Sequence, residues 1–397
     1  MDATQRIKLP EELRVMPFNL RFLELVGLWG PRGQLYRFYL AVTFAAMVIL
    51  FPKAVLGIGS SDVTAICKGI AEFVFELAIF VNVTIIAVKR KSLESVIQGL
   101  GEIFYELSVG EESDDNYDMI LKLNLKMRKF FNFLILYSGC APFAFCLPSL
   151  IINHWRFWNN HFPLNFELPM EQEFYGLHIR KNFTHYHIFV AFSIAAYCIC
   201  AFLELIKIAT TCFIIKYSSL TYRLIATMIK KLPNNDKDMQ TTVDVEKLKE
   251  IVELHRKAYN ITNQIEEICQ IPVALEFLTC VMFWCLNMIY ISNKVDLNLV
   301  SVLIIFWLSL VQTFSFSYLG SELAEEAAAV GKAIFDLSWY EHPVELQRCY
   351  RLIIQRTQRP TGITGAKLFF VHRTTFASVM QMSYSYYLVL NDVLSKL

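Results

Sequence analysis

Long apolar runs separated by polar connections are the main pattern of this chain. Seven of them are long enough to cross the hydrocarbon core of a bilayer as helices, which takes about 20 residues: 35–57, 66–88, 130–153, 187–215, 268–292, 298–320 and 366–391. The short alternating strands of a membrane barrel are missing, and a helix satisfies its own backbone in lipid. The pattern therefore predicts an all-α polytopic membrane protein with seven transmembrane helices.

Three of the connections also carry helical periodicity. YSSLTYRLIATMIKK continues the fourth run, VDVEKLKEIVELHRKAYNITNQIEEI leads into the fifth, and SELAEEAAAVGKAIFD continues the sixth. PNNDKDMQTT and EHP interrupt them, and EESDDNYD at 111–118 has the composition of a solvated acidic loop. We expect these helices to project from the membrane and to pack together outside it.

The distribution of Lys and Arg predicts the orientation. The amino segment and the second, fourth and sixth connections hold 26 of these residues, whereas the remaining connections and the tail hold five. Because positive connections stay in the cytosol, the amino terminus is expected there and the carboxyl terminus outside. Of the three sequons, only the one at Asn182 then lies on the outer side, where it is either a glycosylation site or an unused chance match.

These expectations divide the chain into four parts. Residues 1–34 form a cytosolic amino-terminal segment, and 35–320 contain six transmembrane helices with their cytosolic extensions. Residues 321–365 form a cytosolic helical anchor region, and 366–397 contain the seventh helix and a short extracellular tail.

Composition narrows the class of protein. Hydrophobic residues make up 55% of the chain and charged residues 18%, and the mean hydropathy is +0.40, as in membrane proteins. A formal charge of +1 argues against a nucleic-acid partner. Gly-rich phosphate loops, HExxH and GxSxG are absent, so neither an enzyme nor a cofactor is indicated. His178, His185 and His187 lack acidic or cysteine partners at ligand spacing, so we expect them to be solvated rather than metal ligands.

Several ionisable residues lie within the expected spans: Lys53, Glu72, Glu76, Glu204, Lys207, Glu276 and Arg373. Such groups are costly in lipid and normally face a bundle interior or water. Glu204 and Lys207 are placed to pair, Glu276 is alone on its run, and Lys53 and Arg373 are expected to extend towards the interface. Polar contacts between helices and a direct role with a ligand or ion both remain open.

Aromatic residues in the outer halves of four runs are candidates for a ligand cavity: Phe73, Phe145, Phe192, Tyr197, Phe306 and Trp307, with Tyr137 deeper. An apolar cavity with a few polar groups is typical of small-molecule sites, and this one would suit a volatile apolar compound. Simple core packing is the alternative for each of them.

The last apolar run has an unusual polar face. Ser378, Met382, Ser385, Val389 and Asp392 recur at steps of three and four, which places them on one side of a helix. A pore lining would explain this face, with Val389 as a hydrophobic constriction and Asp392 as an outer charge that favours cations. Since one helix cannot enclose a channel, several chains would surround a common axis. Close helix packing through Ser383 and Ser385 explains the hydroxyls equally well.

The carboxyl third, SYLGSELAEEAAAVGKAIFDLSWYE followed by RLIIQRTQRPTGITGAKLFFVHRTTFASVMQMSYSYYLVL, closely resembles the insect odorant receptors. The resemblance implies a tetrameric, odorant-gated, nonselective cation channel in the plasma membrane of olfactory sensory neurons. Its implied partners are a small volatile organic ligand, a co-receptor subunit, membrane lipids and permeant cations. By this resemblance Val389 is the gate position, Asp392 lies at the outer mouth, and the pocket lies in the outer part of the second, third, fourth and sixth spans.

The short connection between the fourth and fifth runs is similar to that of a tuning subunit rather than the co-receptor. Related gustatory receptors end in a TY pair followed by a QF pair, where this chain has Ser385 and Tyr386 and then Asp392 and Val393. This difference favours an odorant receptor over a gustatory receptor channel. A G-protein-coupled-type receptor is an alternative that requires the opposite orientation and lacks motif support, because no DRY-like or NPxxY-like motif is present. A small-molecule transporter is a further alternative.

Overall fold

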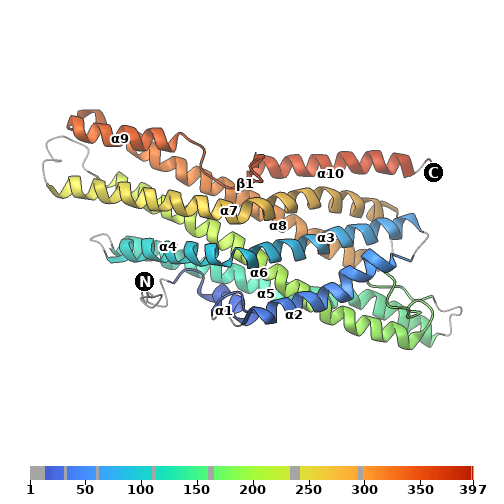
Figure 1. Ribbon diagram of the computed structural model, residues 1–397. Helices are drawn as coiled ribbons and strands as arrows, with labels where there is room; N and C mark the ends of the chain where they lie inside the picture. Colours follow the sequence, from blue (N-terminus) through green and yellow to red (C-terminus); the bar gives the residue numbers. More distant parts are fainter. Residues whose placement is uncertain are drawn as a thin grey trace.

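The computed structural model describes residues 14–30, 34–59, 62–109, 113–159, 165–232, 242–293, 298–394 and 396. Its helices, in chain order, are α1 (Pro17–Val26), α2 (Leu35–Ala45), the π-helical turns η3 (Ala46–Leu50) and η4 (Pro52–Leu56), α3 (Val63–Val88), α4 (Arg90–Val109), α5 (Ser113–Trp158), α6 (Phe183–Lys230), α7 (Thr242–Asn293), α8 (Asn298–Phe335), the 3-10 turn η5 (Trp339–Glu341), α9 (Val344–Thr357) and α10 (Arg373–Leu394). Two short strands, β1 (Thr364–Gly365) and β2 (Phe369–Phe370), precede α10. The long helices run side by side as an elongated bundle (Figure 1).

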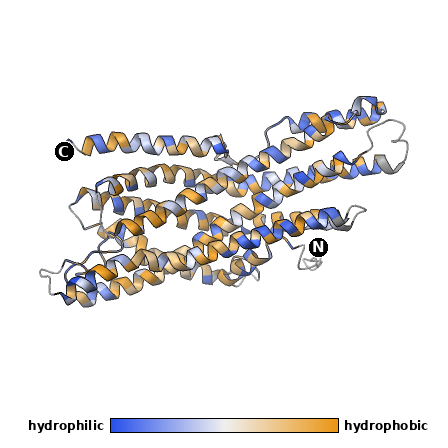
Figure 2. Cartoon of the chain, turned by 180° about the vertical axis from the view of Figure 1, so that it is seen from behind, coloured by the Kyte–Doolittle hydropathy of each residue, from blue (hydrophilic) through white to orange (hydrophobic). Residues whose placement is uncertain are grey.

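Six of these helical segments are long and apolar enough to cross a membrane: α2 with η3 and η4, α3, α5, α6, α7 and α8. The seventh, α10, has 22 residues, which at about 1.5 Å per residue spans the hydrocarbon core. The protein is therefore an all-α polytopic membrane protein, as the apolar runs predict. Figure 2 shows apolar residues through the middle of the long helices and more polar residues towards the end that carries α9.

The seventh helix begins later than expected. It starts at Arg373 rather than at residue 366, because Thr364–Gly365 pairs with Phe369–Phe370 as a small antiparallel hairpin. Ala366 and Lys367 have positive φ angles of 50° and 60°, a conformation that no helix can contain. The apolar letters KLFF thus belong to a hairpin that joins the anchor region to α10.

The helical extensions are confirmed. α6 continues to Lys230, α7 begins at Thr242 and α8 continues to Phe335, and a hydrophobic core fills the space between them. Much of the expected break PNNDKDMQTT, residues 233–241, lies outside the described residues, as do 1–13 of the amino segment. The orientation predicted from Lys and Arg stays a prediction.

The acidic stretch at 111–118 is not simply a loop. Its described part, from Ser113 onwards, is the first turn and a half of α5. The Asn116 side chain is buried and its Nδ2 donates to the Leu107 carbonyl of α4 at 3.2 Å. One polar side chain thereby ties the two helices together, so this segment packs where its net charge alone suggests free solvation.

α10 lies along one edge of the bundle, as Figure 1 shows. It packs against α7 and α8, and the residues it buries fully are Val379 and Ser383. Much of the remaining surface of this apolar helix has no neighbour among the residues that the structure describes.

Candidate functional site

A partly open apolar cavity of about 80 Å³ lies between α3, α5, α6, α7 and α8. Its lining residues are Glu72, Phe75, Glu76, Ile79, Ala141, Pro142, Phe145, Tyr197, Cys200, Ala201, Glu204, Phe283, Ile305 and Leu308. Although three carboxylates are among them, the lining exposes almost only apolar atoms, since the carboxylates take part in ion pairs described below. The cavity is thus an apolar space that touches buried charge.

Two of the seven predicted pocket residues line this cavity. Phe145 and Tyr197 meet edge to face, with ring centroids 4.7 Å apart. The Tyr197 hydroxyl also lies 3.5 Å from the Glu76 carboxylate. These two residues join α5 and α6 at one wall of the cavity.

The other five predicted residues lie outside the lining. Phe192 and Trp307 are exposed on the outer surface of the helices, Trp307 to 61% of its area. The Tyr137 hydroxyl donates to the Ile304 carbonyl at 2.8 Å, Phe306 packs near Trp284, and Phe73 is half-buried on α3. Any ligand contact of these five stays a prediction.

Neighbouring side chains that were not predicted from the sequence line the cavity in place of three of these residues. Phe75 lines the cavity instead of Phe73, and Ile305 and Leu308 do so instead of Phe306 and Trp307. Successive helical residues point about 100° apart, so an error of one or two positions turns a side chain away from the cavity. Phe283, from α7, stacks on Phe75 with centroids 4.9 Å apart. The aromatic pattern alone did not indicate that α7 takes part.

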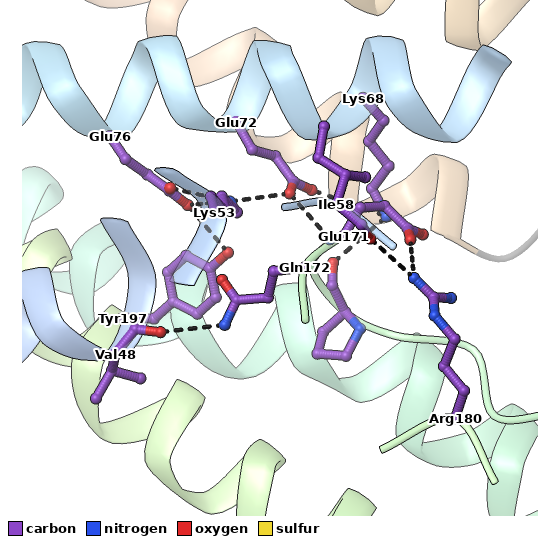
Figure 3. Close-up of polar contacts among 11 residues, drawn as sticks. Val48, Lys53, Ile58, Lys68, Glu72, Glu76, Glu171, Gln172, Arg180 and Tyr197 are labelled. Carbon is purple, nitrogen blue, oxygen red and sulfur yellow. Dashed lines mark hydrogen bonds and ion pairs between the residues drawn. The ribbon is translucent and has the colours of Figure 1, made fainter. Parts of the chain in front are cut away.

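A buried ion network borders the cavity around Lys53 (Figure 3). Its Nζ lies 3.1 Å from a Glu72 carboxylate oxygen and 2.9 Å from both oxygens of Glu76. All three side chains are at least nine-tenths buried. Lys53 therefore does not extend to the interface as expected. It lies on η4, where Pro52 lacks an N–H and the widened turn carries the lysine inwards.

The same network holds the segment before α6 against the bundle, as Figure 3 shows. The Glu171 backbone N–H donates to Glu72 at 3.2 Å, and the Glu171 carboxylate pairs with Arg180 at 2.9 Å. Lys68 reaches the Pro169 carbonyl at 3.4 Å. These contacts fasten the connection between α5 and α6 over the ends of the helices that line the cavity.

A second buried ion cluster lies on another side of the cavity. The Lys207 Nζ is 2.8 Å from Glu204 and 2.8 Å from Glu276, which joins α6 to α7. Asn82 of α3 also points its amide towards Glu276, at 3.5 Å. Glu276 is therefore not isolated, in contrast to the expectation from its own run. Its partner comes from another helix, which spacing along one helix cannot indicate.

The predicted pore residues all lie on the surface of α10. Ser385, Val389 and Asp392 are exposed, Val389 to 62% of its area. Asp392 pairs with Lys396 at 2.5 Å. Ser383 is fully buried against the bundle, whereas Ser385 is exposed. Of these two serines, Ser383 is therefore the one that packs against the described helices. The role of the exposed face stays a prediction.

Asn182 and the candidate histidines lie at or near the start of α6. Asn182 is exposed and caps α6, its Oδ1 accepting from the Thr184 N–H at 2.9 Å, and its glycosylation stays a prediction. His187 is half-buried beside His154, with the two Nε2 atoms 3.2 Å apart, so it is not simply solvated. Among the described residues, no three His, Cys, Asp or Glu side chains gather at a metal site.

Together, the apolar helices, the cavity between them and the paired charges within the spans define a polytopic membrane protein with an apolar cavity. The profile of the 7tm Odorant receptor family matches residues 62–384. The chain belongs to this family.

Individual relatives agree with the family match. The odorant receptor coreceptor of Aedes aegypti is 31% identical over 142 residues, which cover 35% of this chain and 30% of that protein. Odorant receptor 67c of Drosophila melanogaster is 26% identical over 166 residues, 41% of this chain and 39% of that protein. The chain thus matches about a third of the length of these curated relatives.

The fold has a solved counterpart. The structure of the insect olfactory receptor OR5 from Machilis hrabei in complex with eugenol covers 97% of this chain and 100% of that chain, with a TM-score of 0.79 and 15% identity. A second structure of OR5, named without a ligand, gives a TM-score of 0.80 at 16% identity over 94% of this chain. At this identity the likeness establishes a shared fold.

Proposed function

We propose that this chain is the odorant-binding subunit of a ligand-gated nonselective cation channel in the plasma membrane, assembling with a co-receptor subunit as a tetramer. The observation that carries the proposal is the apolar cavity among the membrane helices of an odorant receptor family member. Members of the same family that match this chain include co-receptors, which supports the proposed partner.

The cavity supports a small apolar ligand with limited hydrogen bonding. Its volume of about 80 Å³ exceeds the roughly 30 Å³ share of one water molecule but is smaller than an engineered cavity of about 150 Å³ that binds benzene. An aromatic ligand would therefore require Phe75, Phe145 or Tyr197 to change rotamer. The related OR5 has a structure with eugenol, a compound that would also need this expansion here.

α10 supports the channel part of the proposal. Its exposed face combines Ser385, Val389 and Asp392 with large apolar side chains, and none of the described residues of the chain covers them. In an assembly, neighbouring subunits would cover the apolar residues while the polar stripe meets water at the axis. The Lys53 and Lys207 clusters are already paired inside the subunit, so they serve better as helix contacts than as a conduction path.

Expression with and without a co-receptor, followed by current recording across a panel of volatile compounds, tests the proposal. We expect ligand-evoked cation currents when both subunits are present. Ligand uptake without current would favour a transporter. An extracellular amino terminus, detected by epitope labelling of intact cells, would favour a G-protein-coupled-type receptor.

The substitution Asp392→Asn is expected to lower the permeability of the channel for cations relative to anions. An exposed carboxylate near the end of α10, repeated around an assembly, attracts cations to the mouth of a pore. Reversal potentials measured in salt gradients give the permeability ratio. Glu253→Gln, a half-buried position on the extension of α7, is the control that should leave the ratio unchanged. Equal ratios in Asp392→Asn and the parent channel would contradict a charge at the conduit.

The substitution Phe145→Ala is expected to shift the half-maximal ligand concentration by about tenfold, which corresponds to about 1.4 kcal/mol. It removes a ring that lines the cavity and contacts Tyr197, so compact ligands lose contacts and bulkier ones gain room. Concentration-response curves for a small and a large ligand provide the measurement. Trp307→Ala, outside the lining, is the matched control. A larger shift in Trp307→Ala than in Phe145→Ala would show that the ligand binds elsewhere.

A further inference from the structure

A second hollow, of about 230 Å³, lies between α5, α6 and α8 and is unrelated to the apolar cavity. Four of its lining residues are cationic and one is acidic: Lys122, Lys126, Lys216, Arg223 and Glu322. Leu123 and Leu220 supply apolar surface in the same hollow. We call these seven residues the basic pocket.

The cations of the basic pocket are only partly neutralised. Lys216 pairs closely with Glu322. Arg223 donates to Glu326 through both Nε, at 2.8 Å, and Nη2, and its Nη2 also lies 3.5 Å from Glu322. Lys122 meets Asp118 at 3.5 Å, but this pair is largely exposed and thus weak. Lys126 is exposed and has no ion-pair partner within the described part of the chain. The pocket therefore retains positive charge that faces solvent.

The position of the basic pocket along the helices matches the level of lipid headgroups. Lys216 directly follows the expected fourth span, and Lys129 directly precedes the expected third span. Lys122, Lys126 and Lys129 recur at steps of four and three, so they form one exposed ridge of α5 beside the pocket. The cations of two helices thus meet where both helices leave the apolar layer, on the side rich in Lys and Arg.

We propose that the basic pocket binds the phosphorylated headgroup of an anionic membrane lipid, such as a phosphoinositide. Basic pockets between transmembrane helices at the cytosolic face are suited to such headgroups. Lys122 and Lys126 supply flexible point charges from one helix, and Arg223 of the facing helix, whose Nε and Nη2 contact Glu326, adds a guanidinium that a phosphate competes for. Leu123 and Leu220 provide an apolar wall for the part of the lipid next to the phosphate.

A lipid bound in the basic pocket would affect the contacts between α8 and the start of α10. Glu322 pairs with cations of the pocket and directly follows Ser321 in α8. The Ser321 Oγ accepts a hydrogen bond of 2.9 Å from the backbone N–H of Arg373, where α10 begins. Glu325, one turn further along α8, pairs with the Arg373 side chain at 3.2 Å. A phosphate that draws Arg223 away from Glu322 changes the charge balance of the α8 segment on which α10 begins.

Binding of dioctanoyl phosphatidylinositol 4,5-bisphosphate to the purified full-length chain in detergent tests the proposal. We expect saturable binding that the double variant Lys122→Gln/Lys126→Gln weakens at least tenfold, with Lys126→Gln alone weakening it less. Both lysines are exposed, so the variants should fold. The control Lys249→Gln/Lys332→Gln removes the same charge from exposed positions away from the pocket and should bind as the parent does.

Three results would overturn the proposal. The first is equal affinity in the Lys122→Gln/Lys126→Gln variant and the parent, and the second is an equal loss in the control. The third is soluble inositol 1,4,5-trisphosphate binding as tightly as the lipid, because the pocket would then recognise a free phosphate compound. Weak binding of this soluble headgroup beside tight binding of the lipid supports the lipid as the source. None of these outcomes depends on whether the chain responds to an odorant.

Discussion

Replacing Lys207 by methionine is expected to destabilise the protein by about 3–5 kcal/mol, the usual cost of breaking a buried ion pair by removing one partner. Lys207 is the cation that both Glu204 and Glu276 contact, each at 2.8 Å, and all three side chains are almost fully buried. The methionine leaves two carboxylates facing each other in an apolar bundle. A lower apparent Tm in detergent, and less protein at the cell surface, would measure the loss.

Two further variants give this prediction its controls. Arg256→Met breaks an exposed ion pair with Glu253 and should leave the Tm unchanged. The triple variant Lys207→Met/Glu204→Gln/Glu276→Gln removes the uncompensated charges and should recover much of the lost stability, as neutral replacements of buried ion clusters do. An unaltered Tm in Lys207→Met would mean that water or another cation already reaches the two carboxylates.

The two buried ion clusters explain how an apolar cavity persists in a packed bundle. Glu72 and Glu76 belong to the Lys53 network, and Glu204 belongs to the Lys207 cluster, yet all three acids also line the cavity. Protein interiors normally pack with few voids, because side chains move to fill them. Here the helices around the cavity are fixed by charge-assisted contacts that would be lost if the helices moved closer together or rotated.

The sequence predicted the helices well because their signals are local. Spans and extensions follow from apolar runs and helix-forming residues, and both appear in α6, α7 and α8. The start of α10 was missed because KLFF, residues 367–370, continues the apolar run of the helix that follows it. Its hairpin depends on the positive φ angles of Ala366 and Lys367 and on a hydrogen bond from the Ala366 N–H to Gln270 of α7 at 2.9 Å.

The cavity was less predictable because its residues are selected by contacts between helices. Phe145 and Tyr197 were found, but Phe75 and Phe283 depend on the rotation of α3 and α7, which neither helix encodes alone. Lys53 looked like an interfacial residue because only the widened turn at Pro52 directs it to the carboxylates of α3. Partners from distant segments have no signature in one sequence.

The substitution Gly320→Ala is expected to destabilise the protein by about 1–3 kcal/mol, the typical cost of overpacking a core. In the interior of α8, alanine alone would favour the helix by up to about 1 kcal/mol. However, a Cβ at this position would lie 2.3 Å from the Val371 carbonyl oxygen, just before α10. Since the obstacle is backbone, the segment joining the hairpin to α10 would have to move away from α8.

Gly139→Ala provides the matched comparison, because the same helical change at that position of α5 meets no atom within 4 Å. We expect its Tm to equal or exceed that of the parent, so the two glycine variants should shift the Tm in opposite directions. Gly320→Ala should also alter ligand-evoked currents more than surface expression explains, because α8 and α10 meet where the proposed gate is attached. A Tm rise in both variants would show that α10 tolerates displacement from α8, and the close approach at Gly320 would then carry no mechanical role.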